Sequence, residues 1–267
     1  MKHMFVVLVL AIIIAGIQSC QQDEMVVENY KDSILNSELK KADGTRIFYG
    51  PATPVGNGIA RTWVKKDLSG NLLEAGVTLS AKALDNLPHH PEAFVLPFHK
   101  SKGKDFFDHV LLDWNPEGHE PPGIYDLPHF DVHFYITTVE ERMAIEYRPD
   151  DSDPDPLYVP ENYFRLPGVV PQMGSHWADA TSPELPPVME TFTHTFIIGS
   201  FDGWFTFWEP MVTRDFLLTN PDVEKEVKQP QAWQRNGWYP TYYKIAWSDR
   251  PGEYTIALTG LTWRNAQ

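Results

Sequence analysis

The stretch that decides the fold is His129-Phe130-Asp131-Val132-His133-Phe134-Tyr135-Ile136. Its side chains alternate in character without a break, and successive side chains of a β-strand point to opposite faces of the sheet. One face carries Phe130, Val132, Phe134 and Ile136, and the other carries His129, Asp131, His133 and Tyr135. The stretch therefore predicts a strand whose apolar face packs on a hydrophobic core.

Similar strand patterns recur on both sides of this stretch. The chain has 9 Trp, 11 Tyr and 15 Phe together with 23 Pro and 17 Gly, a composition typical of short strands joined by ordered loops. We expect further strands at residues 46–50, 58–65, 72–79, 92–98, 105–114, 192–199, 204–208, 242–247 and 254–261. The predicted fold class is mainly β, an antiparallel barrel or sandwich, with a cupin-like barrel as one form.

The predicted helices are few, short and peripheral. The clearest begins at Thr138, where Glu141 three residues later completes a capping box, and runs to about Tyr147. No internal repeat divides the chain, so we expect residues 45–267 to form a single β-rich domain.

The first twenty residues read as a lipoprotein signal peptide. A short basic start precedes an apolar run at residues 4–17, which is too short to span a bilayer. The run ends in Ile17-Gln18-Ser19-Cys20, which resembles a lipobox, although Gln18 departs from that pattern. Because Cys20 is the only cysteine, a structural disulfide is excluded and lipid attachment at Cys20 is expected. The alternative is an ordinary secretory signal with an incidental cysteine.

Residues 21–44 are polar and predict a flexible tether behind the anchor. The tether starts with Gln21-Gln22-Asp23-Glu24, which resembles the acidic export tag of Bacteroidetes lipoproteins and favours display on the outer surface of an outer membrane. The net charge of −14 argues against nucleic acid as a partner. The expected membrane contact is therefore the lipid on Cys20 alone, in an extracytoplasmic location.

The polar face of the central strand indicates a metal site. Side chains at i and i+2 of a strand stand about 6.7 Å apart, and those at i and i+4 about 13 Å apart. Asp131 can therefore share an ion with His129 or with His133, whereas the two histidines share one only if the strand bends. The alternative is that both histidines are merely hydrogen-bonded inside a polar barrel.

Any such site needs ligands from elsewhere in the chain. The best candidates are His176 and Glu209, followed by His119, Glu120 and His194. Two histidines with a carboxylate suit zinc, iron or manganese. For Glu209 the alternative is a buried acid paired with Arg61 or Arg214.

Several motifs resemble a family of secreted bacterial proteins of unknown function, one member of which is a Thermus protein under sigma-factor control. They are Arg61-Thr62-Trp63-Val64, Gly118-His119-Glu120-Pro121, Pro128-His129-Phe130-Asp131-Val132-His133-Phe134-Tyr135, Met173-Gly174-Ser175-His176-Trp177 and Trp208-Glu209-Pro210-Met211. The resemblance extends over roughly residues 45–220 and implies a secreted β-rich fold. A thinner likeness links the histidine strand to cupins and α-type carbonic anhydrases, which use His-x-His where this chain has His-x-Asp-x-His.

The sequence thus predicts a cell-envelope lipoprotein that binds a transition metal through His129, Asp131, His133, His176 and Glu209, with His119 and Glu120 as second-tier candidates. Catalysis is left open, as are a small-molecule ligand and the oligomeric state. The rival prediction is a non-enzymatic module that binds glycan or peptide through its C-terminal aromatics, Trp233, Trp238, Tyr239, Tyr242 and Tyr243.

Overall fold

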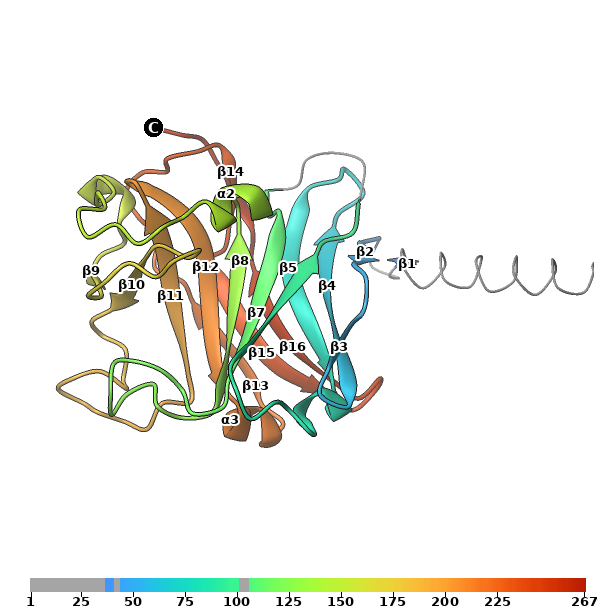
Figure 1. The fold of residues 1–267 in the computed structure, drawn as a ribbon. Coiled ribbons are helices and arrows are strands. Elements are labelled where there is room, and N and C mark those ends of the chain that lie inside the picture. Colours follow the sequence, from blue (N-terminus) through green and yellow to red (C-terminus); the bar gives the residue numbers. More distant parts are fainter. Residues whose placement is uncertain (1–36, 41–43, 101–105) are drawn as a thin grey trace, which may run out of the picture.

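The fold is built from two antiparallel sheets (Figure 1). A computed structural model describes residues 37–40, 44–100 and 106–267. One sheet has eight strands: β1 (Ser37–Lys40), β2 (Arg46–Tyr49), β3 (Thr53–Val55), β4 (Gly58–Lys66), β5 (Leu72–Ser80), β16 (Glu253–Thr259), β15 (Tyr242–Ser248) and β13 (Asp222–Glu226). The other has seven, in the order β6 (Glu92–Pro97), β7 (His109–Asn115), β8 (His129–Tyr135), β12 (Trp204–Thr213), β11 (His194–Phe201), β10 (Ser175–Asp179) and β9 (Tyr163–Arg165).

The remaining elements are small. β14 (Gly237–Tyr239) pairs with β17 (Thr262–Arg264) outside the two main sheets. The helices within the described ranges are α2 (Val139–Met143), α3 (Arg214–Leu218) and two 3₁₀ turns, Ala81–Leu84 and Pro156–Tyr158. The predicted capping box is present, because Thr138 accepts a hydrogen bond from the Glu141 N–H and Glu141 accepts one from the Thr138 N–H. Among the described residues, no helix is both long and apolar enough to cross a membrane.

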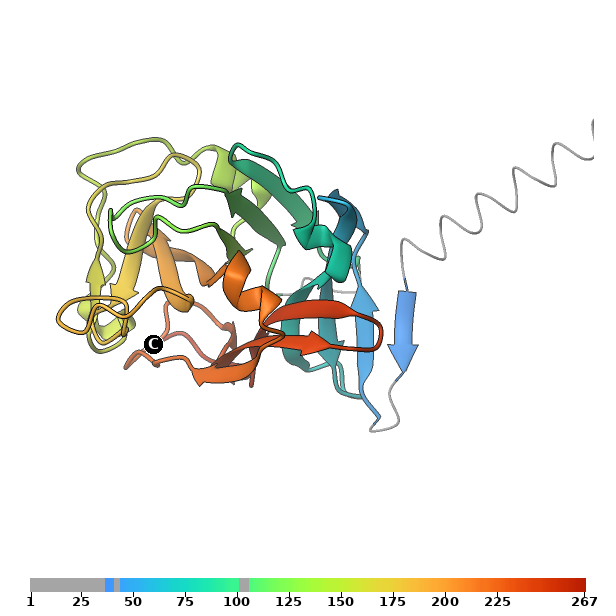
Figure 2. The ribbon, with the colours of Figure 1, turned by 90° about the horizontal axis from the view of Figure 1, so that it is seen from below.

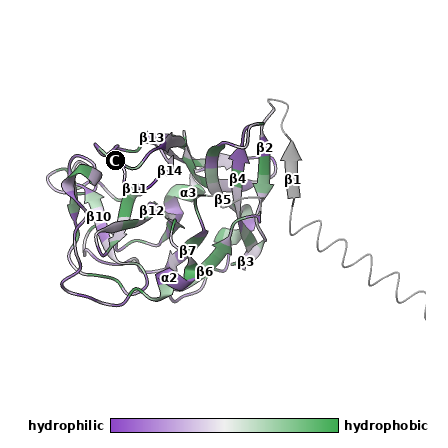
Figure 3. Cartoon of the chain, turned by 90° about the horizontal axis from the view of Figure 1, so that it is seen from above, coloured by the Kyte–Doolittle hydropathy of each residue, from purple (hydrophilic) through white to green (hydrophobic). Residues whose placement is uncertain are grey.

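The core lies between the two sheets. Its buried side chains include Val77 and Ile256 from one sheet and Phe130, Val132 and Phe134 from the other. Figure 2 shows the red β15–β16 hairpin and the green β7–β8 pair in separate layers, and Figure 3 shows hydrophobic stretches on strands of the seven-stranded sheet, among them β6 and β11. The predicted apolar face of β8 therefore packs into a sandwich core, as the alternation indicates.

The mainly β, antiparallel fold class is confirmed, and the sandwich is the form it takes. The barrel alternative is wrong for the described strands, because the strand orders end at β1 and β13 in one sheet and at β6 and β9 in the other without closing. The sequences of the edge strands explain why the two sheets stay open. β13 carries the charged sequence DVEKE and β9 is only 3 residues long, both features of open edges that resist further pairing.

The segment expected to act as a tether overlaps the described region at two places. Ser37–Lys40 forms β1, which pairs with β2, and Gly44 is described as well. Cys20 and the predicted signal peptide lie outside the described residues.

Candidate metal centre

The polar face of β8 is buried as deeply as its apolar face. His129, Asp131 and His133 are all buried, although they point away from the core between the sheets. The outer face of the seven-stranded sheet is covered by loops, in which Tyr125, Leu185 and Phe192 form a second hydrophobic cluster with strand residues. Figure 1 shows the green 116–128 and yellow-orange 180–193 connections extending from the same end of this sheet. The expected polar barrel interior is thus a loop-covered sheet face.

Strand register gathers the polar side chains on this covered face. Asp113 of β7 is paired with Asp131 of β8, and Met211 of β12 is paired with Asp131 from the other side. Glu209 precedes Met211 by two residues and therefore lies on the same face, beside His133. His176 enters from β10, where it pairs with Gly199.

These side chains line a cavity of about 930 Å³. Its polar lining includes Asp113, Asn115, His119, Glu120, Asp131, His133, His176 and Glu209. Most of its remaining wall is apolar and comes from the loops and the outer face of the sheet, for example Ile124, Leu166 and Met173. Among the residues that the structure describes, no Lys or Arg lines this cavity. Of the eight sequence-predicted candidates, all except His129 and His194 line the cavity directly, and His129 lies in contact with Asp131.

The residues divide into two groups, each of which could hold a metal ion. The first is His119, His129 and Asp131, and the second is His133, His176 and Glu209. In both groups the ligand atoms lie within 4.8 Å of one another. His129 and His133 fall in different groups, which agrees with their separation of about 13 Å along a straight strand.

The first group has two imidazoles in fixed orientations. The Nδ1 of His129 lies 2.6 Å from the Leu127 carbonyl oxygen, and the Nδ1 of His119 lies 2.7 Å from the Glu120 carbonyl oxygen. Because a carbonyl oxygen only accepts hydrogen bonds, each Nδ1 carries the proton. The Nε2 of a neutral imidazole then presents a lone pair, and both Nε2 atoms face Asp131.

Both Nε2 atoms lie close to the carboxylate of Asp131, one near each oxygen. Its Oδ1 lies 3.0 Å from His129 Nε2, and its Oδ2 lies 3.2 Å from His119 Nε2. Asn115 donates to Oδ2 at 2.7 Å and holds the carboxylate in place. Burial raises the pKa of Asp131, but His129 and His119 outweigh that effect and hold the pKa well below its usual value.

His119 stands at the open side of the group, with 40% of its side chain exposed. Burial lowers its pKa, but the hydrogen bond and the charge of Asp131 prevail and raise the pKa to about 9. In the absence of a metal ion, a proton on His119 therefore compensates the buried carboxylate.

The second group centres on His133. Its Nδ1 lies 3.0 Å from Asp113 Oδ2, and its Nε2 lies 3.4 Å from Glu209 Oε1. His176 Nε2 lies 3.9 Å from the other oxygen of Glu209. Burial raises the pKa of Glu209 to about 8 and lowers that of His176 to about 3, while Glu209 and Asp113 overcome burial and raise the pKa of His133 to about 9.

Asp113 and Asn115 were not among the sequence-predicted candidates. The signal for Asp113 was present, because this carboxylate interrupts the apolar run from Val110 to Trp114. Asn115 gave no such signal, since it stands at the end of β7, where polar residues are common. Glu120, in contrast, lines the cavity but belongs to neither metal-binding group.

Two alternatives from the sequence are wrong in the structure. The ion-pair partners of Glu209 are His133 and His176, whereas Arg61 pairs with Glu253 and Arg214 donates to the Leu84 carbonyl oxygen. His194 does not reach the cavity. Its Nδ1 lies 2.9 Å from the Tyr243 hydroxyl, in a different part of the sandwich.

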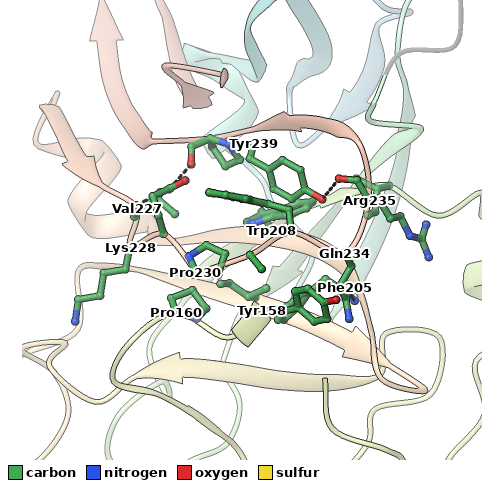
Figure 4. A pocket seen from close by; sticks show the side chains of 16 residues that line it. Tyr158, Pro160, Phe205, Trp208, Val227, Lys228, Pro230, Gln234, Arg235 and Tyr239 are labelled. Atoms are coloured by element: carbon green, nitrogen blue, oxygen red, sulfur yellow. Dashed lines mark hydrogen bonds between the residues drawn. The ribbon is translucent and has the colours of Figure 1, made fainter. Parts of the chain in front are cut away.

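The five C-terminal aromatics named for glycan binding are mostly covered by other residues. Of the five residues named for glycan binding, only Tyr242 is exposed, while Tyr239 and Tyr243 are buried in the core. Trp233 and Tyr239 line a cavity with Trp208 and Phe205 (Figure 4). This cavity measures about 30 Å³, which is room for about one water molecule and far too little for a sugar ring.

Comparison with known proteins gives one partial match. The family described as "TTHB210-like: Hypothetical protein TTHB210" matches residues 67–114. The searches among curated proteins and among solved structures find no match. The matched stretch covers β5, β6 and most of β7 and contains Asp113, but it ends before the histidine strand. Over that stretch the chain is similar to the Thermus-related family expected from its motifs.

Proposed function

We propose that this protein is an envelope lipoprotein whose β-sandwich binds a transition metal through His119, His129 and Asp131. The observation that carries the proposal is the pair of Nε2 atoms directed at one carboxylate while both Nδ1 atoms face backbone carbonyls. This is the arrangement by which proteins orient metal-binding histidines. His119 can face the carboxylate with a proton when no metal is bound, but the Nε2 lone pair of His129 repels it unless a cation lies between them.

A proton satisfies this requirement poorly at His129. The Nε2 of His129 and the Oδ1 of Asp131 are both buried, and neither has a hydrogen-bond partner among the described residues despite their separation of 3.0 Å. Their relative direction is thus unsuited to an N–H donor. Two ligand atoms about 2.1 Å from one metal ion stand about 3.0 to 3.4 Å apart for angles between 90° and tetrahedral. The separations of 3.0 and 3.2 Å lie in that range.

The donor set selects the class of metal. Two imidazoles and one carboxylate favour zinc, iron or manganese over calcium or magnesium, which prefer oxygen ligands. Three protein ligands leave at least one coordination position free for a small molecule. When bound, such an ion supplies a Lewis acid that polarises a carbonyl or phosphoryl oxygen.

The cavity indicates what else binds there. Its volume of about 930 Å³ is typical of a small-molecule site, and its mostly apolar wall faces the polar group. We therefore propose a ligand with an apolar body and an oxygen or nitrogen donor. Among the described residues, the basic side chains that line the cavity are histidines, so an anionic ligand would depend on them and on the metal for recognition.

The envelope location rests on the sequence. An apolar run ending at Cys20 supports lipidation, and the acidic residues that follow support surface display. Replacing Cys20 with serine tests this part of the proposal. We expect the Cys20→Ser protein to move from the membrane fraction to the soluble fraction, and an unchanged distribution would contradict lipidation at this position.

Metal analysis tests the site itself. The purified chain is loaded with zinc, iron(II) or manganese, freed of excess ion and measured by mass spectrometry beside His129→Ala. His89→Ala is the matched control, because His89 is exposed in a loop outside the cavity. We expect His129→Ala to lose an ion that the parent and the control retain. A parent that takes up none of the three metals would overturn the proposal.

A further inference from the structure

We infer that the cavity holds two metal ions, the second bound by His133, His176 and Glu209. This inference rests on the proposed function, because it places a second ion beside the first. It is carried by the geometry of the second group, which is independent of His119 and His129.

The second group contains buried polar atoms without partners. Both ring nitrogens of His133 and the Oε2 of Glu209 make no hydrogen bond among the described residues. The side chains of His133 and Glu209 are 1% and 2% exposed. Buried polar atoms of this kind are normally satisfied, and leaving them unsatisfied costs roughly 1 to 3 kcal/mol each. A cation between His133, His176 and Glu209 satisfies the inward-facing atoms together.

Asp113 completes the arrangement from behind. Its Oδ2 lies 3.0 Å from His133 Nδ1, on the opposite side of the ring from Glu209. A carboxylate behind a histidine orients the ring and makes its other nitrogen a better ligand. Asp113 thus lies behind the Nδ1 of His133 as the Leu127 carbonyl lies behind the Nδ1 of His129, although only the contact with Leu127 has the geometry of a hydrogen bond.

The charges of the buried carboxylates also support a second ion. Asp113, Asp131 and Glu209 are all buried at the cavity, and no lysine or arginine of the described part of the chain lines it. Buried carboxylates need paired positive charge. An ion at the first group compensates Asp131. A second divalent ion would bind Glu209 directly and lie close to Asp113, which contacts the other side of the His133 ring.

The two positions lie within reach of one ligand. Asp131 and His133 are two residues apart on β8, so their side chains start about 6.7 Å apart on the same face. Asp131 serves the first group and His133 the second. A small molecule that carries two donor atoms would therefore be able to contact both ions.

The test counts ions and measures their proximity. The full chain is loaded with manganese and compared with His129→Ala and His176→Ala, with His89→Ala as control. His176 is chosen because it is the most exposed ligand of the second group and its loss should disturb folding least. Metal content gives the stoichiometry, and electron paramagnetic resonance reports magnetic coupling between two manganese ions.

We expect two equivalents in the parent and the control, coupled to each other, and one uncoupled equivalent in each variant. One equivalent in the parent that disappears in His129→Ala but remains in His176→Ala would overturn the second ion and leave the proposed function intact. One equivalent that depends on His176 alone would overturn both assignments. The parent stoichiometry decides the question even if a variant does not fold.

Discussion

The packing of Phe207 supports the second group of ligands and can be tested by adding one methyl group. Gly199 of β11 faces the ring of Phe207, and a Cβ built on Gly199 would overlap three ring atoms. The ring is fully buried and lies 4.7 Å from the His133 ring and 5.3 Å from the His176 ring, measured between centroids. Gly199→Ala must therefore displace Phe207 toward these histidines or shift β11.

The expected cost follows from this overlap. Adding atoms to a well-packed core lowers the free energy of unfolding by about 1 to 3 kcal/mol. For a domain of this size each kcal/mol lowers the melting temperature by about 2 to 4 °C, so Gly199→Ala should lower it by about 2 to 12 °C. Displacing the ring should also weaken ion binding at the second group, while the first group, which Phe207 does not contact, keeps its ion.

A double-mutant cycle with Phe207→Leu identifies the cause. Leucine lacks the outer ring atoms that the new methyl group would meet, so Gly199→Ala should cost at least about 0.5 kcal/mol less in that background. The four proteins are compared by chemical denaturation, and their metal content is measured in parallel. Equal costs in both backgrounds would show that the overlap is not with Phe207 and refute this reasoning.

Three further predictions concern stability. Asp151→Ala should lower the free energy of unfolding by about 2 to 4 kcal/mol. The buried Asp151 accepts hydrogen bonds from the Ser175 hydroxyl and the Asp202 N–H and pairs with two arginines. A denaturation midpoint equal to that of the parent would contradict this prediction. Burial lowers the pKa of His194 to about 4 in the folded protein. Between about pH 6.5 and 4 the unfolded chain therefore binds a proton at His194 that the folded chain does not bind, so the free energy of unfolding falls as the pH falls through this range. His194→Gln should reduce that loss by at most about 1.4 kcal/mol per pH unit, and parallel pH profiles of the two proteins would contradict this. At a free metal concentration a hundred times Kd, a bound ion stabilises the folded protein by about 2.7 kcal/mol. Removing the ion with a chelator should therefore lower the melting temperature of the metal-loaded protein by about 5 to 11 °C. The melting temperature of His129→Ala should fall less.

Much of the fold could be predicted because β8 alternates with a period of two. That pattern placed Phe130, Val132 and Phe134 in the core and turned Asp131 and His133 to the opposite face, as the structure shows. It could not reveal what covers the opposite face. The cover comes from loops whose conformations depend on contacts distant in sequence, such as Tyr125 against Phe192. The sandwich and the barrel therefore remained equal alternatives.

The candidate site, like the fold, could be predicted in part. Strand spacing separated His129 from His133, and the structure places them in different groups. The sequence could not place His119 in the first group, because His119 lies in a Pro- and Gly-rich loop, where no periodicity tells which way a side chain points. Asp113 was missed because its partner His133 lies on the neighbouring strand, and strand register cannot be read from one sequence.

The most direct test of the metal centre is anomalous X-ray diffraction from crystals of zinc-loaded protein, recorded on both sides of the zinc absorption edge. We predict an anomalous difference peak between His119 and His129, about 2.0 to 2.2 Å from each Nε2 and from a carboxylate oxygen of Asp131. A peak-free cavity in crystals that carry zinc elsewhere, with both imidazoles still against Asp131, would contradict the account and leave a hydrogen-bonded cluster in its place.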